Sequence, residues 1–261
     1  MSEYNSNYSL YLPSYSIGPD CYKEIPYVTR FFGKTAAVIG GKTAMSKAKN
    51  ALIEGVKGSD VKLLDFIEYG GNSTYENGDA LIANPTVQKA DMLFAVGGGR
   101  ACDTVKYVAD KLDKPLFTFP TVGSNCASVT AISVIYNPDG SFRDYYYPKL
   151  ANHCFINSAV IADSPEKLLW AGIGDALSKE YEAVFSSKDD TLFHTPLMGR
   201  QVSRICTDPL IEYGTQALES IREKKPSFAL DQVILDIIVS TGIVSNMMTT
   251  VDSYYYNSTL A

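Results

Sequence analysis

The 261-residue sequence has little positive charge and does not concentrate it anywhere. Its 23 lysines and arginines are outnumbered by 29 aspartates and glutamates, which gives a formal net charge of −6. The longest basic run is the pair Lys224 and Lys225. Because binding to nucleic acid requires basic groups that neutralise phosphates, we expect no nucleic-acid partner.

Long apolar runs and cysteine motifs are also missing. The most apolar stretch, 233–239, is interrupted by Asp236 and is far shorter than the roughly 20 residues of a membrane helix, so no membrane partner is expected. The segment 1–12 lacks the charged and apolar regions of a secretory signal. The five cysteines are scattered without a C-x-x-C pair, which argues against a disulfide framework or structural zinc and favours the reducing cytoplasm.

The sequence does contain short apolar or β-branched runs that alternate with helical periodicity. This alternation is typical of a parallel sheet with crossover helices. The predicted strands are 35–39, 61–66, 91–96, 116–119 and 155–163, and the predicted helices among them are 45–56 and 105–112. A turn cluster at 137–140 also predicts a hairpin between the runs 131–136 and 142–147.

After residue 165 the patterns are helical throughout. The expected helices are 166–170, 175–185, 209–222 and 228–248. The sequence therefore predicts an α/β fold, with a parallel-sheet domain at 1–163 and an all-helical domain at 164–261. The last helix is apolar over much of its circumference, so we expect it to be buried in a full helical domain or at a subunit contact, or exposed in a shortened chain.

Three glycines, Gly97, Gly98 and Gly99, stand between a predicted strand and a predicted helix. Glycines here leave the backbone N–H groups of the helix start open, and the positive end of the helix dipole favours an anion. The spacing is not G-x-G-x-x-G, however, and a tight structural turn explains a bare triplet about equally well. On the helix, Asp103 and Lys106 are one turn apart and could form an ion pair or face a ligand.

A second polar segment, 120–125, follows the neighbouring strand at the edge where open α/β sheets bind ligands. Its hydroxyl groups could reach a phosphate, although such a stretch is more often only a polar loop.

Three segments together resemble the iron-containing alcohol dehydrogenase family in order and spacing, and within it most of all the glycerol dehydrogenase branch. The segments are AVGGGRACDTVKYVADKLDKP, FPTVGSNCASVTAISVIYNPDGSF and WAGIGDALSKEYEA. The resemblance extends from about Gly33 to the C-terminus. It implies a dinucleotide-binding domain, a helical domain of the dehydroquinate synthase type, and a divalent metal, zinc or iron, in the cleft between them.

The resemblance also implies roles for single residues. The positions that match the family's cofactor-binding residues are Gly97, Gly98, Gly99, Asp103, Thr121, Ser124, Thr130, Ile132 and Tyr136. Arg100 stands where glycerol dehydrogenases usually have lysine. Asp175 matches the catalytic carboxylate that helps to hold the metal, which would act as a Lewis acid on the substrate oxygen during hydride transfer. Without the resemblance, Asp175 would more readily be interpreted as a residue that caps a helix or pairs with Lys179 one turn further on.

The chain departs from the family at the metal. The family's two histidine ligands are missing as far as residue 261, and the two histidines present, His153 in a predicted strand region and His194 in a predicted loop, lie outside that context. One carboxylate is too few ligands for a tight catalytic zinc site. We therefore expect the chain to be C-terminally shortened.

Two further departures concern the substrate and the cofactor. Cys126 stands where glycerol dehydrogenases carry a substrate-binding Asp, and a thiol binds hydroxyls weakly, which favours a less polar alcohol, aldehyde or ketone. Gly40, Gly41, Lys42 and Thr43 replace an acidic residue that often binds the adenine ribose in NAD-dependent members. Without that acidic residue a 2′-phosphate is not repelled, and Lys42 could attract it. We therefore expect Gly41 and Lys42 to bind NADP or NAD.

The sequence thus predicts a cytoplasmic, metal-assisted, NAD- or NADP-dependent oxidoreductase for a small-molecule alcohol, polyol or carbonyl substrate, assembled as a homo-oligomer. One alternative is a catalytically incomplete nucleotide-binding remnant that does not turn over. A less favoured alternative is a dehydroquinate synthase-like lyase, which would need a basic cluster for the substrate phosphate that is not seen near Asp175.

Overall fold

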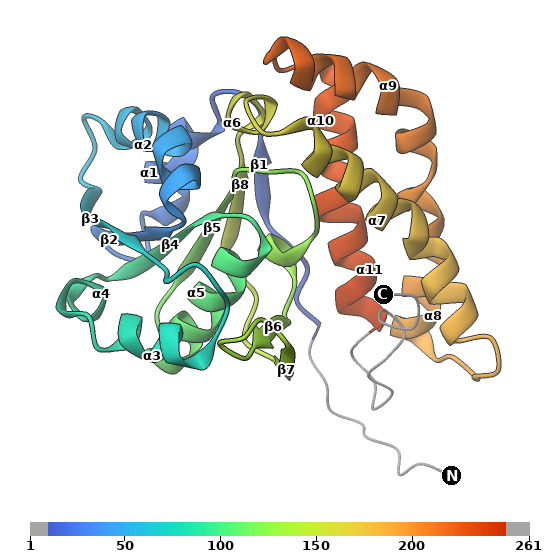
Figure 1. Ribbon diagram of the computed structural model, residues 1–261, viewed down its shortest axis with the longest axis horizontal. Coiled ribbons are helices and arrows are strands. Elements are labelled where there is room, and N and C mark those ends of the chain that lie inside the picture. Colours follow the sequence, from blue (N-terminus) through green and yellow to red (C-terminus); the bar gives the residue numbers. More distant parts are fainter. Residues whose placement is uncertain (1–9, 249–261) are drawn as a thin grey trace.

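The computed structural model describes residues 10–248, and a six-stranded parallel sheet organises the first part of them (Figure 1). The strand order is β1-β8-β5-β4-β2-β3. The strands are β1 (Tyr15–Ile17), β2 (Thr35–Gly40), β3 (Lys62–Glu68), β4 (Met92–Gly97), β5 (Leu116–Pro120) and β8 (His153–Ile156). All pairs in this sheet are parallel, as the alternating sequence pattern predicts.

Helices cover both faces of the sheet, which is why its central strands are apolar at nearly every position. They are α1 (Ile25–Thr29), α2 (Lys42–Val56), α3 (Tyr75–Ile82), α4 (Pro85–Lys89), α5 (Gly99–Lys111) and α6 (Ser158–Ala162). Val38 and Phe94 pack on the side of α1 and α2, whereas Ile39 and Leu93 pack on the side of α3 and α5. Figure 1 shows these two groups of helices on opposite sides of the sheet.

The predicted hairpin is present as β6 (Ser133–Tyr136) and β7 (Phe142–Tyr146), an antiparallel pair outside the main sheet. Its rings lie against α5: Tyr146 is 5.1 Å from Tyr107, centroid to centroid. The backbone N–H of Tyr136 also donates to the carbonyl of Ser73, at 2.7 Å. These contacts hold the hairpin along α5, next to the segment that precedes α3.

The described chain after residue 165 is helical, as predicted, and forms a second group of elements beside the sheet (Figure 1). Its helices are α7 (Glu166–Ser186), α8 (His194–Val202), α9 (Asp208–Glu223), α10 (Phe228–Leu235) and α11 (Thr241–Met248). The two helices expected at 166–170 and 175–185 are one continuous helix, and His194 begins α8 instead of lying in a loop. A domain boundary near residue 163 stays a prediction.

The strand expected at 155–163 is wrong beyond Ile156. The strand ends at Ile156, and Asn157 then caps α6, its side-chain oxygen accepting from the N–H groups of Ala159 and Val160 at 3.0 and 3.1 Å. A cap of this kind accepts from the free N–H groups of the first helical turn and so favours a helix start at this position. The apolar run after Asn157 is therefore helical. The pattern also missed β1, α1, α3, α4 and α8, all of which are short.

The long apolar segment near the end of the described chain lies mainly in the protein core. Phe228–Met248 runs through α10, a π-helical turn at Asp236–Ser240 and α11, and it is the one stretch among residues 10–248 with the length and apolarity of a membrane span. Because 61% of its most apolar window is buried within the protein, it is packed as core helices of globular proteins are. Phe228 at its start is exposed, but most of the segment is buried, which differs from the exposure expected for a shortened chain.

Candidate functional site

The sheet reverses its direction of winding between β2 and β4. β2 leads through α2 outward to β3, whereas β4 leads through α5 to β5 on the other side. In open α/β sheets, ligands bind beyond the carboxyl ends of the strands at such a point. A cleft of about 800 Å³ lies there, and its walls come from the first turns of α2 and α5, the segment after β5, and α7.

Glycines allow the backbones at the cleft floor to approach closely. A Cβ on Gly40 would lie 2.1 Å from the carbonyl oxygen of Val96, so no side chain fits between β2 and β4. Gly97 has a φ of +150°, and Gly98 is the N-cap of α5 without a side-chain cap. Gly41 starts α2 in the same uncapped way. Two helix starts with open N–H groups therefore border the cleft, and each favours an anion.

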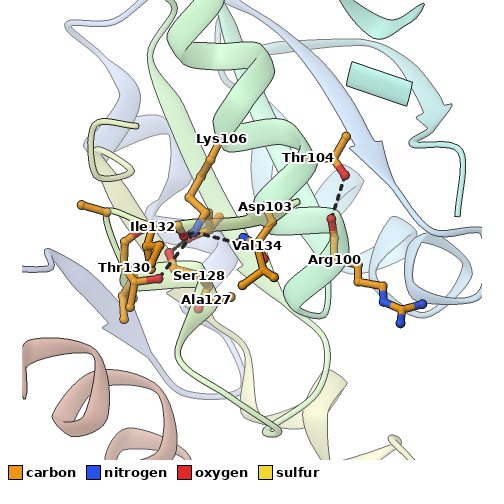
Figure 2. Close-up of polar contacts among 12 residues, drawn as sticks. Arg100, Asp103, Thr104, Lys106, Ala127, Ser128, Thr130, Ile132 and Val134 are labelled. Atoms are coloured by element: carbon orange, nitrogen blue, oxygen red, sulfur yellow. Dashed lines mark hydrogen bonds and ion pairs between the residues drawn. The ribbon is translucent and has the colours of Figure 1, made fainter. Parts of the chain in front are cut away.

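Asp103 and Lys106 form a buried ion pair beneath this cleft (Figure 2). The ammonium lies 2.9 Å from Asp103 Oδ1 and also donates to the carbonyls of Thr130, at 3.2 Å, and Ile132. Asp103 Oδ2 accepts from the N–H of Val134 at 3.2 Å. Burial raises the pKa of Asp103, and the charge of Lys106 opposes that rise. The pair thus ties the segment 130–134 to α5, with Asp103 still at the cleft wall.

Arg100 is the exposed cation at the start of α5. Its guanidinium lies over the Tyr136 ring, 5.2 Å from the centroid, and its side chain points away from the Lys106 network in Figure 2. The cleft therefore has a positive side chain beside the open N–H groups of Gly98 and Gly99.

Helix α7 packs directly on the segment that follows β5. A Cβ on Gly172 would lie 2.2 Å from the carbonyl oxygen of Gly123, and one on Gly242 of α11 would lie 2.4 Å from Val129. Asn246 of α11 accepts from the N–H of Ala131 and donates to the carbonyl of Val129, both at 3.0 Å. The segment is consequently held from two sides by helices far from it in the sequence.

This packing brings Asp175 and Lys179 of α7 into the cleft with Cys126. Lys179 pairs with Glu182 at 2.8 Å and makes no ion pair with Asp175, so the simple pairing that the sequence also allowed does not form among the described residues. Although Asp175 faces the open cleft, surrounding protein raises the pKa of its carboxyl, Glu182 adds to the rise and Lys179 opposes it. Burial raises the pKa of the Cys126 thiol, which keeps it uncharged.

All but one of the residues predicted from the sequence line this single cleft. Those that do are Gly41, Gly97, Gly98, Gly99, Arg100, Asp103, Thr121, Ser124, Cys126, Thr130, Ile132, Tyr136 and Asp175. Lys42 is not among the lining residues, because the first turn of α2 presents Thr43, and one turn later Lys47, to the cleft instead.

Sequence reasoning missed Lys47, Tyr69, Asp163 and Lys179 as cleft residues. The spacing of one turn from Thr43 and from Asp175 could have indicated Lys47 and Lys179. His153 lies elsewhere, between Ser14 and Ser16, with its ring nitrogens 2.7 and 2.9 Å from their hydroxyls.

The described residues do not by themselves fit a divalent metal. Residues 10–248 contain no group of three or more His, Cys, Asp and Glu side chains arranged to hold a metal ion. Near Asp175 the next charged group on α7 is the ammonium of Lys179, which repels a cation. Residues 249–261, after which the family's histidines were expected, lie outside the described residues.

The sheet order, the cleft at the switch point and the helical group beside it define an α/β fold built like those of dinucleotide-dependent enzymes. Comparison with known proteins identifies the family. The family model described as iron-containing alcohol dehydrogenase matches residues 13–164, and the chain belongs to this family.

Among individual relatives, glycerol dehydrogenase 1 of Schizosaccharomyces pombe is 31% identical over 222 residues, 83% of this chain and 49% of that protein. Glycerol dehydrogenase of Thermotoga maritima is 33% identical over 171 residues, 64% of this chain and 47% of that protein. A crystal structure of glycerol dehydrogenase from S. pombe superposes with a TM-score of 0.81 at 25% identity, covering 92% of this chain and 63% of that one. The chain spans about half the length of the curated relatives it matches.

Proposed function

We propose that the cleft binds a nicotinamide dinucleotide and that the chain serves in an oxidoreductase for a small alcohol or polyol and the corresponding carbonyl compound. The observation that supports this most directly is the pair of uncapped helix starts, at Gly41 and Gly98, on either side of the switch point. Membership of the family and the names of the relatives, glycerol dehydrogenases, support the same reaction class.

In this proposal the N–H groups at the start of α5 bind the pyrophosphate, and Arg100 adds charge beside it. The hydroxyls of Thr121 and Ser124 contact the cofactor, and Thr130, Ile132 and Tyr136 line the nicotinamide side. When bound, the nicotinamide supplies or accepts the hydride. The fixed segment 130–134, tied to α5 by Lys106, orients the ring, because its position does not depend on ligand contacts.

The test is NADH binding, followed by the change in nicotinamide fluorescence, with a pair of matched variants. Gly98→Asp places a carboxylate at the start of α5, and we expect it to weaken NADH binding at least tenfold because like charges repel there. Gly174→Asp is the control, since a Cβ on Gly174 meets no atom within 4 Å and the residue does not line the cleft. Equal NADH affinity of the Gly98→Asp variant and the wild type would contradict the proposal.

We further propose that NADP is accepted, with Lys47 as the basic residue nearest to the 2′-phosphate in place of Lys42. Lys47 lines the cleft beside Gly41, Thr43 and Ala44, which carry no carboxylate. The carboxylate nearby, Asp163, is paired with both Lys47 and Lys224, so its negative charge is balanced. Lys47→Met should reduce affinity for NADPH more than for NADH, and Lys42→Met should change neither. A wild-type chain that binds NADH but not NADPH would refute the assignment.

The remaining features of the proposal come from the sequence. Cys126 favours a less polar alcohol or carbonyl over glycerol, and Cys126→Asp should restore preference for the polyol. The metal, with Asp175 as one ligand, requires groups beyond the described residues. A homo-oligomeric state and a cytoplasmic location stay predictions.

A further inference from the structure

Lys179 is a buried cation that nonetheless faces the cleft. Its exposed fraction is 5%, and it lines the cleft together with Asp175 and Cys126. An ammonium group has three N–H donors. Within residues 10–248, the hydrogen bond that it makes is the one to Glu182 Oε2, at 2.8 Å. A buried donor without a partner is costly, so the remaining N–H groups indicate a ligand oxygen in the cleft.

The position of this ammonium is fixed by its surroundings. Glu182 is itself buried, and its second oxygen lies 2.8 Å from the hydroxyl of Ser178. That hydroxyl is also 2.8 Å from the backbone carbonyl of Asp175. About two turns of α7 thus form a connected unit that holds the charge of Lys179 in place before any ligand arrives. A charge held in place in advance is the arrangement that stabilises developing charge most effectively.

The neighbours of Lys179 leave it the strongest donor at this end of the cleft. The Cys126 thiol is a weak donor, and Asp175 in its ionised form only accepts hydrogen bonds. Arg100 and Lys47 project from α5 and α2, at the end of the cleft where the open helix starts lie.

We propose that Lys179 is a catalytic residue whose ammonium donates a hydrogen bond to the reacting oxygen of the substrate; this rests on the proposed function above. In the direction of reduction, the carbonyl carbon receives a hydride from reduced nicotinamide, and the π electron pair of the carbonyl moves onto its oxygen. The nicotinamide is thereby oxidised. The alkoxide forms beside the positive charge of Lys179 and then takes a proton that is ultimately supplied by water in the open cleft.

Steady-state reduction of hydroxyacetone by the full chain with NADH or NADPH tests this. Lys179→Met removes the charge but keeps most of the chain length, and we expect kcat to fall about a hundredfold with a much smaller change in KM, as when an oxyanion donor is lost. Lys179→Arg keeps a cation and should retain more activity than Lys179→Met. Lys167→Met, an exposed lysine on the same helix, is the control and should match the wild type.

A binding measurement makes the test independent of turnover. Acetamide offers a carbonyl oxygen that is not reduced, and its binding to the NADH-loaded chain should be at least tenfold weaker in Lys179→Met, while NADH binding itself is unchanged. The inference is overturned if Lys179→Met binds acetamide as tightly as the wild type, or keeps kcat within threefold of it. A wild-type chain that does not bind NADH would instead refute the proposed function. Thermal unfolding of each variant separates these effects from a loss of folding.

Discussion

Because Gly172 of α7 closely contacts the segment after β5, we predict that alanine has opposite effects on stability at two positions of this helix. A Cβ at Gly172 would lie 2.2 Å from the carbonyl oxygen of Gly123, whereas ordinary contacts begin at 3.4 Å, so Gly172→Ala requires a shift of about 1.2 Å against a backbone atom. Overpacking of this kind costs about 3 kcal/mol, at the upper end of the usual range. Alanine returns about 1 kcal/mol in helix propensity, which leaves a net loss of about 2 kcal/mol.

Gly174, two residues later on the same helix, is the matched control. Its Cβ would meet no atom within 4 Å, so Gly174→Ala should stabilise the protein by about 1 kcal/mol through helix propensity alone. Urea unfolding followed by circular dichroism measures both, and the midpoint should fall for Gly172→Ala and rise for Gly174→Ala at an unchanged slope. Two midpoints that move together would refute the idea that α7 is pressed against the Gly123 segment.

Two further predictions concern pH and have opposite signs. Burial lowers the pKa of His153 to about 4 from an ordinary 6.5, so the unfolded chain binds the proton first as pH falls. The free energy of unfolding should therefore fall by about 3 kcal/mol between pH 6.5 and pH 4. His153→Gln should reduce this loss, which urea midpoints measured across that range would show. Burial raises the pKa of Asp236 to about 7 from 3.8, so stability is lost as pH rises between 4 and 7, by about 4 kcal/mol. Asp236→Asn should therefore raise the midpoint at pH 8 and leave it nearly unchanged at pH 4, and an equal change at both pH values would show that the carboxyl does not titrate as inferred.

The sequence sufficed for the sheet and for the cleft floor because those features are local. The order of strand, glycine and helix around Gly98 is visible in one short window, and the neighbouring segment follows from the rule that ligands bind at the carboxyl ends of parallel strands. The short elements were missed for a related reason. β1 has three residues and owes its pairing to β8, which lies more than 130 residues away, and no periodicity can develop over that length.

The cleft residues that sequence reasoning missed depend on tertiary packing. Lys179 lies among charged residues of α7, and its burial depends on the packing of α7 against other helices and the segment after β5, which the sequence of α7 alone does not show. Lys42 was chosen over Lys47 because it is nearest to the glycines in sequence, but the rotation of α2 decides which side chain reaches the cleft. Such errors arise wherever a contact between distant segments determines how deeply a side chain is buried or in which direction it points.

The two ends of the cleft differ in charge, and this difference links the two proposals. At one end the positive ends of α2 and α5 meet with Lys47 and Arg100, which suits phosphate groups. At the other end Lys179 shares the cleft wall with Asp175 and Cys126, so positive charge is not in excess there, and a neutral carbonyl can accept a hydrogen bond from Lys179. A dinucleotide whose phosphates occupy the positive end would extend its nicotinamide toward the segment 130–134, which α11 holds through Asn246. In the two proposals, contacts within α7 hold the charge of Lys179, and α11 holds the wall against which the ring would lie. The two groups that the reaction would need are therefore held in place by the helical part of the chain.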